Sequence, residues 1–339
     1  MDLQPRVVFS TGEVVDWMVA GGISQYAEFK PVRAGVLWTP EGFKPVPCNK
    51  SEIFQDTTMS MLEKRKLMKF MESCQTLVEN AEFDPEQGFL EFMAAQEVPE
   101  NLQNIILFGV LMVEGDIRDY TLGNALNALQ QYIYSLGVYK ENSAMLYPMY
   151  GTSDVSQGFC RLCAVDGGIY VINPELQPVS VASNEEHKVV LTAMGELKAR
   201  TVVVNRSFAD LDPAAQFVPE CSVLRGVVLA RGIAYQNEGP VFLSIPPNSI
   251  ENPNAIYILQ VTSDNMVVPE GYSLLYLYTF CSRYQEDLAA LQNLVPNLGV
   301  EVVFFGSYLQ ETGSTSGSLL HVNAPALGFQ FNKHFVRVT

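Results

Sequence analysis

Two cysteines three residues apart are the side chains in this sequence whose type and spacing most directly suggest chemistry. Cys160 and Cys163 flank Arg161 within the segment Gln157 to Ile172, "QGFCRLCAVDGGIYVI". A Cys-x-x-Cys pair can bind zinc, but a structural zinc site needs four ligands. The sequence has no second pair of this kind, and its three histidines are far apart. The segment therefore does not predict a metal site.

A redox-active thiol pair is the alternative. Such a pair lies at a strand-to-helix junction, where the helix N-terminus lowers the thiol pKa. Here the apolar residues around Cys160 and Cys163 continue one helical pattern, so we expect both thiols to pack as small apolar side chains. Because the other cysteines are scattered and mostly follow or precede apolar residues, we expect reduced, buried thiols throughout.

Motifs for nucleotide and nucleophilic chemistry are missing from the sequence. No Gly-x-Gly-x-x-Gly follows a strand, and no glycine-rich loop ends in Gly-Lys-Ser or Gly-Lys-Thr. "DGGIY", at 166–170, is expected to be a tight turn from a helix into a strand. The serine-rich run at 313–318 has no hydrophobic strand pattern before it and is expected to be a polar loop. The sequence thus predicts no cofactor and no catalytic centre.

Composition limits the kinds of partner. A net charge of −16 disfavours nucleic acid, which is bound through clustered Lys and Arg. The charged fraction of 17% is low and favours a protein whose surface is partly covered by partners. The N-terminus does not have the pattern of a secretory signal, and no run of about 18 apolar residues occurs. We therefore expect a soluble, cytosolic protein.

The 339 residues suggest about two domains. Residues 1–50 read as mixed α/β, with a strand at "RVVF" and a helix with Thr11 as N-cap and Gly21-Gly22 as its end. Two strand-like runs, "AGVLW" and "FKPVPC", follow and are separated by the turn "TPEG". Residues 51–140 read as all helical, beginning with the capping box "SMLE" at 60–63. Residues 141–339 return to α/β. This order predicts an α/β domain with an inserted all-helical domain.

The helical predictions rest on apolar residues at helical spacing. One stripe runs from Leu67 to Val78, and another includes Leu122, Leu126, Leu129 and Ile133 before Gly137. After Gly151 we expect a helix at 155–165 and then strands. The expected strands are "GIYVI", "HKVVLTAM", "ARTVVVN", "VLRGVVLA", "VFLSI", "AIYILQV", "YSLLYLYTF" and "VEVVFF", with a helix at "YQEDLAALQNLV" before the last.

Three stretches carry a resemblance to a known family. "YPMYGTSDVSQGFCRLCAVDGGIYVINPEL" matches a pattern of Tyr-Pro-x-Tyr-Gly, Gln-x-Phe-x-Arg and Gly-Gly-x-Tyr, and "ISQYAEFKPV" and "SEIFQDTTMSMLEKRKLMKFM" agree with it. These motifs resemble the superfamily of Rab escort proteins and Rab GDP-dissociation inhibitors. The resemblance implies a flavoprotein-like α/β domain of the kind that binds FAD or NAD(P), with a helical insertion. It implies a non-catalytic protein.

In this family an escort protein holds a GDP-bound Rab GTPase and presents it to the geranylgeranyltransferase α/β heterodimer. It then shields the attached prenyl lipid and delivers the Rab to membranes, which implies a cytosolic protein with transient membrane association. Carried over by position, the Rab-facing residues are Asp154, Gln157, Arg161, Ile169 and Val171. A planar guanidinium suits interface acceptors, so Arg161 is the leading candidate. A local ion pair on its own helix is the alternative role for Arg161.

The same resemblance assigns the transferase contact to Phe54 and to Arg65, eleven residues further on. An exposed aromatic anchor beside an arginine makes a small hot spot. The alternative for Phe54 is a hydrophobic staple onto its own helix.

Some features depart from the family. Its opening strand and glycine turn, and a long stretch before "PRVVF", have no counterpart here, so the sequence predicts a chain that lacks part of the α/β core. Asp154 stands where the family has Glu, and Ser153 and Ser156 stand where it has Gly and Pro. Two other functions stay open, a GDP-dissociation inhibitor that recycles prenylated Rab and a flavin-dependent oxidoreductase.

Overall fold

The structure of this chain is a computed structural model that describes residues 1–80, 82–140, 142–172, 178–183, 188–317 and 319–322. The described residues form two compact units. The first unit comprises Met1–Gly158 and Leu224–Tyr308, and the second comprises Phe159–Val223 together with 309–322. The boundaries between the units fall within one helix, α7 (Ser153–Val165), and two long strands, β9 (Gln216–Arg231) and β13 (Glu301–Ser316).

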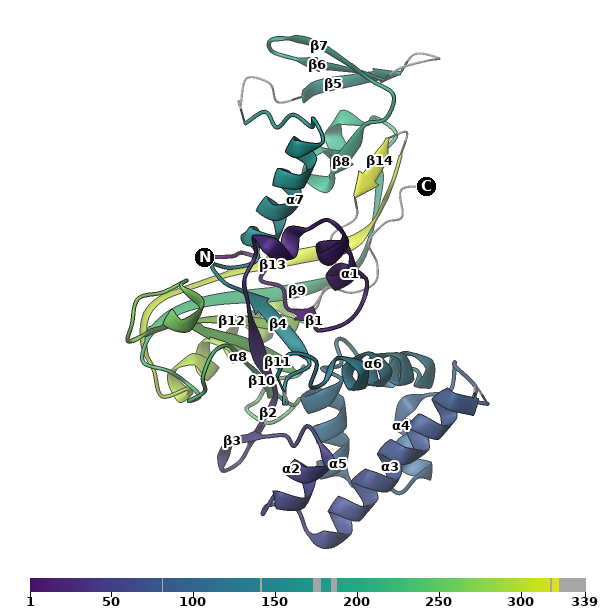
Figure 1. Cartoon of the computed structure of the whole chain (residues 1–339), viewed down its shortest axis with the longest axis vertical. Helices are drawn as coiled ribbons and strands as arrows, with labels where there is room; N and C mark the ends of the chain where they lie inside the picture. The colour runs from purple at the N-terminus through teal and green to yellow at the C-terminus, as the bar shows by residue number, and fades with distance from the viewer. Residues whose placement is uncertain (81, 141, 173–177, 184–187, 318, 323–339) are drawn as a thin grey trace. The chain divides into compact units, whose positions relative to one another are not determined.

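A mixed sheet of nine described strands dominates the structure (Figure 1), in the order β1-β4-β2-β10-β11-β12-β9-β13 with β3 paired to β2. Strands β2 and β10 pair in parallel, whereas β1/β4, β4/β2, β10/β11 and β11/β12 are antiparallel. The remaining bounds are β1 Val8–Phe9, β2 Phe29–Thr39, β3 Gly42–Pro45, β4 Met145–Pro148, β10 Val241–Ile245, β11 Ile256–Thr262 and β12 Tyr272–Phe280.

The centre of the sheet is formed by the most apolar strands of the sequence. All residues of β10 and β11 are buried, and so are the seven inner residues of β12. Near-continuous apolar runs of this kind are typical of strands covered on both faces. The helix α8 (Tyr284–Asn297) contributes Leu291 and Leu294 to the same hydrophobic cluster as Leu243, Ile258 and Leu277. Burial of this cluster is the main stabilising term for the sheet.

Aromatic side chains connect the sheet to the helical residues of the first unit. The ring centroids of Tyr257 and Tyr278 are 5.3 Å apart, and those of Tyr257 and Phe242 are 6.0 Å apart. The hydroxyl of Tyr257 donates a hydrogen bond to the carbonyl oxygen of Val113 at 2.5 Å. Since Val113 follows the helical segment Ile105–Val110, this bond fixes that segment against the sheet.

Residues 50–135 contain helices and no β-strand among those described (Figure 1). The predicted capping box is confirmed, because the Glu63 carboxylate accepts from the Ser60 amide at 2.7 Å and the Ser60 hydroxyl accepts from the Glu63 amide at 3.3 Å. Leu122, Leu126 and Leu129 are buried as predicted, but Ile133 is exposed and Tyr132 is buried instead. The helices are α2 Lys50–Gln55, α3 Met61–Asn80, α4 Phe89–Ala95, α5 Glu100–Asn104, the π-helix η2 Ile105–Val110, the short η3 Ile117–Asp119 and α6 Leu122–Ser135.

At the N-terminus the predicted helix forms as α1 (Glu13–Ala20) and ends before Gly21 as expected, but its N-cap is Gly12. Thr11 was the wrong residue for this role. Its hydroxyl instead hydrogen-bonds the Ser135 hydroxyl at 2.7 Å, which ties this turn to the end of α6. A short helix, η1 (Ile23–Gln25), follows α1.

The second unit has a three-stranded sheet, β5-β6-β7, and a two-stranded parallel sheet, β14-β8. Strands β6 and β7 form a hairpin, with Thr192 paired to Gly195 across its turn. A buried hydrogen bond is formed here between the Nε2 of His321 and the Oδ2 of Asp212, which lie 3.0 Å apart. The bounds are β5 Pro178–Ser183, β6 Lys188–Thr192, β7 Gly195–Ala199, β8 Val203–Asn205, η5 Arg206–Leu211 and β14 Leu320–Val322.

Two local predictions for this part of the chain are wrong. Residues 168–172 were expected to be a strand, but they are irregular and pair with no described strand. The serine-rich run, expected to be a loop, continues β13 as far as Ser316. The apolar run Val302–Phe305 occupies only the start of β13, and mostly polar residues continue the strand to Ser316.

Candidate functional site

Phe54 and Arg65 are both presented to solvent by neighbouring helices. Phe54 lies in the last turn of α2 with 57% of its surface exposed. Arg65 is exposed in the second turn of α3. A hydrophobic staple would bury the Phe54 ring against its helix, so this exposure argues against the staple.

A buried lysine fixes the position of Phe54. Lys64 is only 7% exposed, and its Nζ donates a hydrogen bond to the carbonyl oxygen of Phe54 at 2.8 Å. A cation at the C-terminal carbonyls of a helix is also favoured by the helix dipole, although α2 is short. Sequence reasoning missed Lys64 because lysines are seldom buried. The signal was its position in α3, three residues before Leu67 on the buried side.

The connection between α2 and α3 is also held by hydrogen bonds. One Asp56 carboxylate oxygen accepts from the backbone amides of Thr58 and Met59 at 2.6 and 3.0 Å. Burial opposes the ionisation of Asp56, but the hydrogen bonds from Thr58 and Met59 and the charge of Lys64 outweigh it and lower the pKa of this carboxyl. Glu63, whose Oε2 atom accepts from the Ser60 amide, also accepts a hydrogen bond at Oε1 from the side-chain amide of Asn101 at 2.5 Å. These contacts hold the connection in one conformation.

Three of the five predicted Rab-facing residues lie on α7. Asp154, Gln157 and Arg161 are spaced by three and four residues, which places them on one side of a helix. Gln157 and Arg161 are exposed, and Asp154 is partly so. Burial, followed by the charge of Glu28, raises the pKa of Asp154.

The start of α7 is anchored by close contacts within the first unit. The Asp2 carboxylate accepts from the Thr152 amide at 2.7 Å. A Cβ atom on Gly158 would lie 2.6 Å from the Cγ2 atom of Ile23, which is far too close. Gly158 is therefore required for α7 to approach η1 at this distance.

Ile169 and Val171 follow a turn after α7. Gly167 has a φ of 90°, a conformation that favours glycine, and so confirms that the Gly-Gly pair forms a turn. Ile169 is 86% exposed and Val171 is 59% exposed. Asp154 and Gln157 belong to the first unit, whereas Arg161, Ile169 and Val171 belong to the second. That all five residues form one surface is therefore a proposal.

The prediction of buried thiols is wrong for most of the cysteines. All six are free, but only Cys74 is buried, Cys163 is exposed and the others are intermediate. The thiols of Cys160 and Cys163 lie beyond Val155 and Gly158, the buried part of α7. Hydrogen bonds of the Tyr170 hydroxyl with Cys163 and then Cys160 raise the pKa of that phenol.

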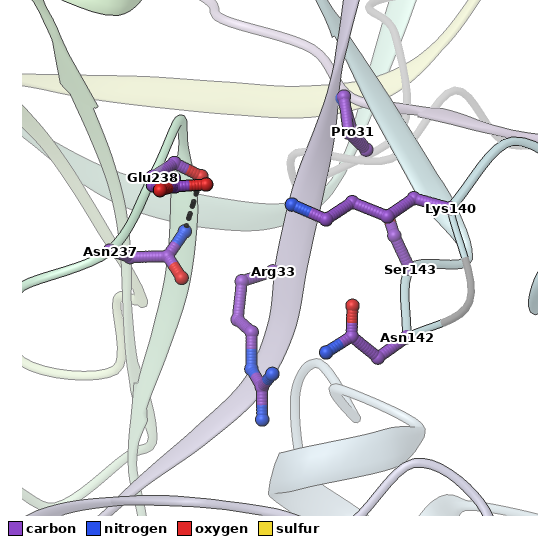
Figure 2. Close-up of a pocket in the computed structure, with 7 residues that line it drawn as sticks. All are labelled: Pro31, Arg33, Lys140, Asn142, Ser143, Asn237 and Glu238. Atoms are coloured by element: carbon purple, nitrogen blue, oxygen red, sulfur yellow. Dashed lines mark hydrogen bonds between the residues drawn. The ribbon is translucent and has the colours of Figure 1, made fainter.

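The first unit also contains a small pocket lined mostly by polar side chains (Figure 2). It is lined by Pro31, Arg33, Lys140, Asn142, Ser143, Asn237 and Glu238. Ser143 is the hydroxyl-bearing residue of this lining, and it donates a hydrogen bond to the Val32 carbonyl oxygen at 2.7 Å. The lining contains no histidine that could activate the Ser143 hydroxyl as a base. The lining therefore has no nucleophile paired with a base.

In the part of the chain that the structure describes, no cluster of three or more His, Cys, Asp and Glu side chains is suited to a metal ion. Within the same residues, none of the helices combines the length and the apolar character needed to cross a membrane.

The sequence profile of a family described as GDP dissociation inhibitor matches residues 1–299. This chain belongs to the GDP dissociation inhibitor family. The match includes α2, α3, α7 and the residues that follow α7, and therefore every candidate residue discussed above. The predicted family resemblance is thereby confirmed.

Among curated members and relatives of the family, Rab escort protein 1 of Arabidopsis thaliana is 30% identical over 87% of this chain and 60% of its own length. The Rab proteins geranylgeranyltransferase component A of Drosophila melanogaster is 28% identical over 94% of this chain and 63% of its own length. The chain thus spans about three-fifths of the length of these relatives.

Solved structures establish the fold of this family member. A Rab GDI from Plasmodium falciparum superposes with a TM-score of 0.78 at 15% identity, covering 98% of this chain and 79% of that one. Cyclohexylamine oxidase from Brevibacterium oxydans gives a TM-score of 0.51 at 12% identity, covering 89% and 72%. The predicted α/β fold with a flavoprotein-like mixed sheet is confirmed.

Proposed function

We propose that this protein is a Rab escort protein, a non-catalytic component that binds GDP-bound Rab GTPases and presents them to the geranylgeranyltransferase α/β heterodimer. In this proposal it then shields the prenyl lipid and delivers the Rab to membranes. The names of the relatives from Arabidopsis and Drosophila support this assignment. The protein would work in the cytosol and associate with membranes only transiently.

The observation that carries the proposal is the pair Phe54 and Arg65. Both side chains are exposed, and the Lys64 hydrogen bond fixes the Phe54 backbone beside α3. An aromatic ring and a guanidinium held in this way have the composition of a protein–protein hot spot. In the proposal they contact the transferase α subunit, and the helices of 51–140 form the inserted domain that carries them.

A second contact is assigned to the Rab GTPase. Asp154, Gln157 and Arg161 share one side of α7, and Ile169 and Val171 expose apolar surface after the Gly167 turn. A guanidinium beside exposed apolar side chains suits a surface that recognises backbone and carboxylate acceptors.

Co-purification with GDP-loaded Rab and the transferase heterodimer tests both contacts. Arg161→Ala is expected to reduce Rab capture, and Phe54→Ala combined with Arg65→Ala is expected to abolish transferase capture. Unchanged yields with both variants would reject the proposal. A GDP-dissociation inhibitor would instead bind prenylated Rab and ignore the transferase, so the same experiment separates the two functions. A flavin-dependent oxidoreductase would show flavin absorbance near 450 nm after purification.

A further inference from the structure

Cys160 and Cys163 form a thiol pair for which the proposed function has no use. They are three residues apart on α7, so they lie on the same side of the helix. Cys163 is exposed, Cys160 is half-buried, and both thiols are free. Reagents in solution can therefore reach this pair, in contrast to the buried thiol of Cys74.

The end of α7 is a turn that leads the chain back toward these thiols. The Gly168 amide donates a hydrogen bond to the Cys163 carbonyl oxygen at 2.7 Å, and the Gly167 amide donates one to the Ala164 carbonyl oxygen at 3.1 Å. With Gly167 at a φ of 90°, these two bonds form a Schellman motif, which ends a helix and redirects the chain.

Tyr170, which follows this turn, shows that the two thiols converge. Its hydroxyl hydrogen-bonds the thiols of Cys163 and Cys160, so both sulfur atoms lie next to one oxygen atom. Gly168 leaves room for this arrangement, because a Cβ atom there would lie 2.3 Å from the Sγ atom of Cys163. The sulfur atoms are thus close to each other in the reduced chain.

Helix geometry permits a bond between the two sulfur atoms. Cα atoms three residues apart in an α-helix are separated by about 5 Å, which lies within the range for disulfides. The Cβ atoms are about 5–6 Å apart in a regular helix and must approach to about 4 Å. The last turns of α7 therefore have to deform slightly, and a disulfide formed under such a constraint is reduced readily.

We propose that Cys160 and Cys163 are a site of reversible oxidation, at which a small disulfide such as oxidised glutathione converts the thiol pair into an intrachain disulfide. The exposed Cys163 thiolate attacks the oxidant, forms a mixed disulfide and releases one glutathione. The Cys160 thiolate then attacks the Cys163 sulfur and releases the second glutathione. Two electrons and two protons pass from the cysteines to the oxidant, which becomes two glutathione thiols.

Tyr170 is a positioning residue in this exchange. Its hydroxyl can donate a hydrogen bond to whichever of the two sulfur atoms carries the negative charge. The pair itself is a modification site and not an oxidoreductase centre. Thiol pairs of disulfide oxidoreductases lie at helix N-termini, whereas Cys160 and Cys163 lie in the second half of α7.

Oxidation has a consequence for Arg161, which lies between the two cysteines. The deformation that closes the disulfide reaches the backbone that carries this guanidinium. This consequence, unlike the disulfide, rests on the proposed function, in which Arg161 contacts the Rab GTPase. The oxidised chain is then expected to bind GDP-loaded Rab several-fold more weakly than the reduced chain.

The test uses the full chain, incubated with mixtures of reduced and oxidised glutathione and then blocked with N-ethylmaleimide. Trypsin cuts after Arg161, between the cysteines, and gives the peptides 141–161 and 162–188 with one cysteine each. A disulfide is expected to hold these peptides together in the mass spectrum, and dithiothreitol added before blocking should separate them. Separate peptides at every glutathione ratio, each carrying N-ethylmaleimide or one glutathione, would overturn the proposal.

Non-reducing electrophoresis of the oxidised chain distinguishes an intrachain disulfide from one between two copies. A monomer band is expected, and a covalent dimer that accounts for the linked peptides would overturn the intrachain bond.

Tyr170→Phe keeps the ring and removes the hydroxyl, and it is expected to slow formation of the linked peptides by about three- to tenfold. The matched control is Tyr139→Phe, which changes an exposed tyrosine outside α7 and should leave the rate unchanged. Equal rates in the two variants would remove Tyr170 from the site.

Binding of GDP-loaded Rab tests the consequence for Arg161. The oxidised chain is separated from glutathione before Rab is added, and the double variant Cys160→Ser/Cys163→Ser should bind equally after either treatment. If the linked peptides form but oxidation leaves Rab affinity unchanged, the disulfide stands and its control of Arg161 is rejected. If Arg161→Ala also binds Rab like the unmodified chain, the Rab contact of the proposed function fails.

Discussion

The ammonium of Lys64 donates a 2.8 Å hydrogen bond to the carbonyl oxygen of Phe54, ten residues earlier in the chain. Lys64 is buried under the connection between α2 and α3, while the Phe54 ring stays in solvent. One buried cation thus determines where an exposed aromatic side chain is presented.

Replacing Lys64 by Met is expected to lower the free energy of unfolding by about 1–3 kcal/mol, because the Phe54 carbonyl loses its charged donor. It should also weaken transferase binding several-fold, since the Phe54 ring is no longer held in place. Chemical denaturation and binding kinetics measure the two effects. Lys66→Met is the control, because the contacts of Lys66 are largely exposed and worth little. Equal losses in the two variants would contradict the role of Lys64.

Arg161→Ala is expected to weaken binding of GDP-loaded Rab at least about tenfold, as for an interface arginine at a hot spot. Arg200→Ala removes another exposed arginine of the second unit and provides the comparison. Calorimetric titration of Rab into each variant gives the affinities. The same affinity for Arg161→Ala and the unmodified chain would return Arg161 to the alternative role, a local ion pair on α7.

Gly158→Ala is expected to destabilise the protein by about 1–3 kcal/mol, because the new methyl group would lie 2.6 Å from the Cγ2 atom of Ile23. Ile23→Ala removes the clashing atom. The double variant should therefore be more stable than the sum of the two single losses predicts. Denaturant unfolding of the four proteins measures this coupling, and strictly additive losses would show that α7 and η1 do not meet at Gly158.

Thiol reactivity should follow exposure. Burial raises the pKa of the Cys74 thiol to about 12, so little thiolate is available at neutral pH. Cys163 is exposed and is expected to be alkylated by iodoacetamide well before Cys74. Mass spectrometry of peptides from briefly labelled protein gives the order. Rapid labelling of Cys74 in folded protein would contradict its burial in α3.

Alkaline pH should destabilise the first unit through its buried tyrosines. Burial, and then the charge of Glu114, raises the pKa of Tyr120 from 10 to about 12, and burial raises the pKa of Tyr257 and Tyr278 well above 10. A group whose pKa is higher in the folded state stabilises the fold below pH 10, and this stability is lost as pH rises through 10 toward 12 and beyond.

Tyrosinate absorbance and near-ultraviolet circular dichroism, recorded together against pH, test this. The buried tyrosines are expected to ionise only as the dichroism disappears. Complete ionisation with the dichroism intact would contradict their burial.

The sequence was sufficient to predict elements whose burial is decided locally. The strands β10, β11 and β12 are near-continuous apolar runs, and the capping box at Ser60 and Glu63 is a local signal, so each appears where it was expected. These elements can be predicted without knowing which residues pack against them.

Features that depend on distant contacts were not predictable in this way. Cys163 is exposed although its helical spacing favoured a core position, because the side of α7 that is buried carries Val155 and Gly158 instead. Lys64 can be buried because the Phe54 carbonyl oxygen, ten residues away, accepts a hydrogen bond from its ammonium. Phe54 and Arg65 themselves were found through family resemblance, because their spacing alone does not distinguish a contact surface from an ordinary helix start.

In the proposed complex, the hydrogen-bonded turn at Asp56, the capping box at Ser60 and the Lys64 contact would lower the entropy cost of association. The backbone between α2 and α3 is already ordered in the free chain, so a partner does not have to restrict it. The entropy lost in that complex would then come mainly from the side-chain rotamers of Phe54 and Arg65. Recognition at this place would therefore resemble a lock-and-key encounter, with little change in amide hydrogen exchange at 56–64 when the partner binds.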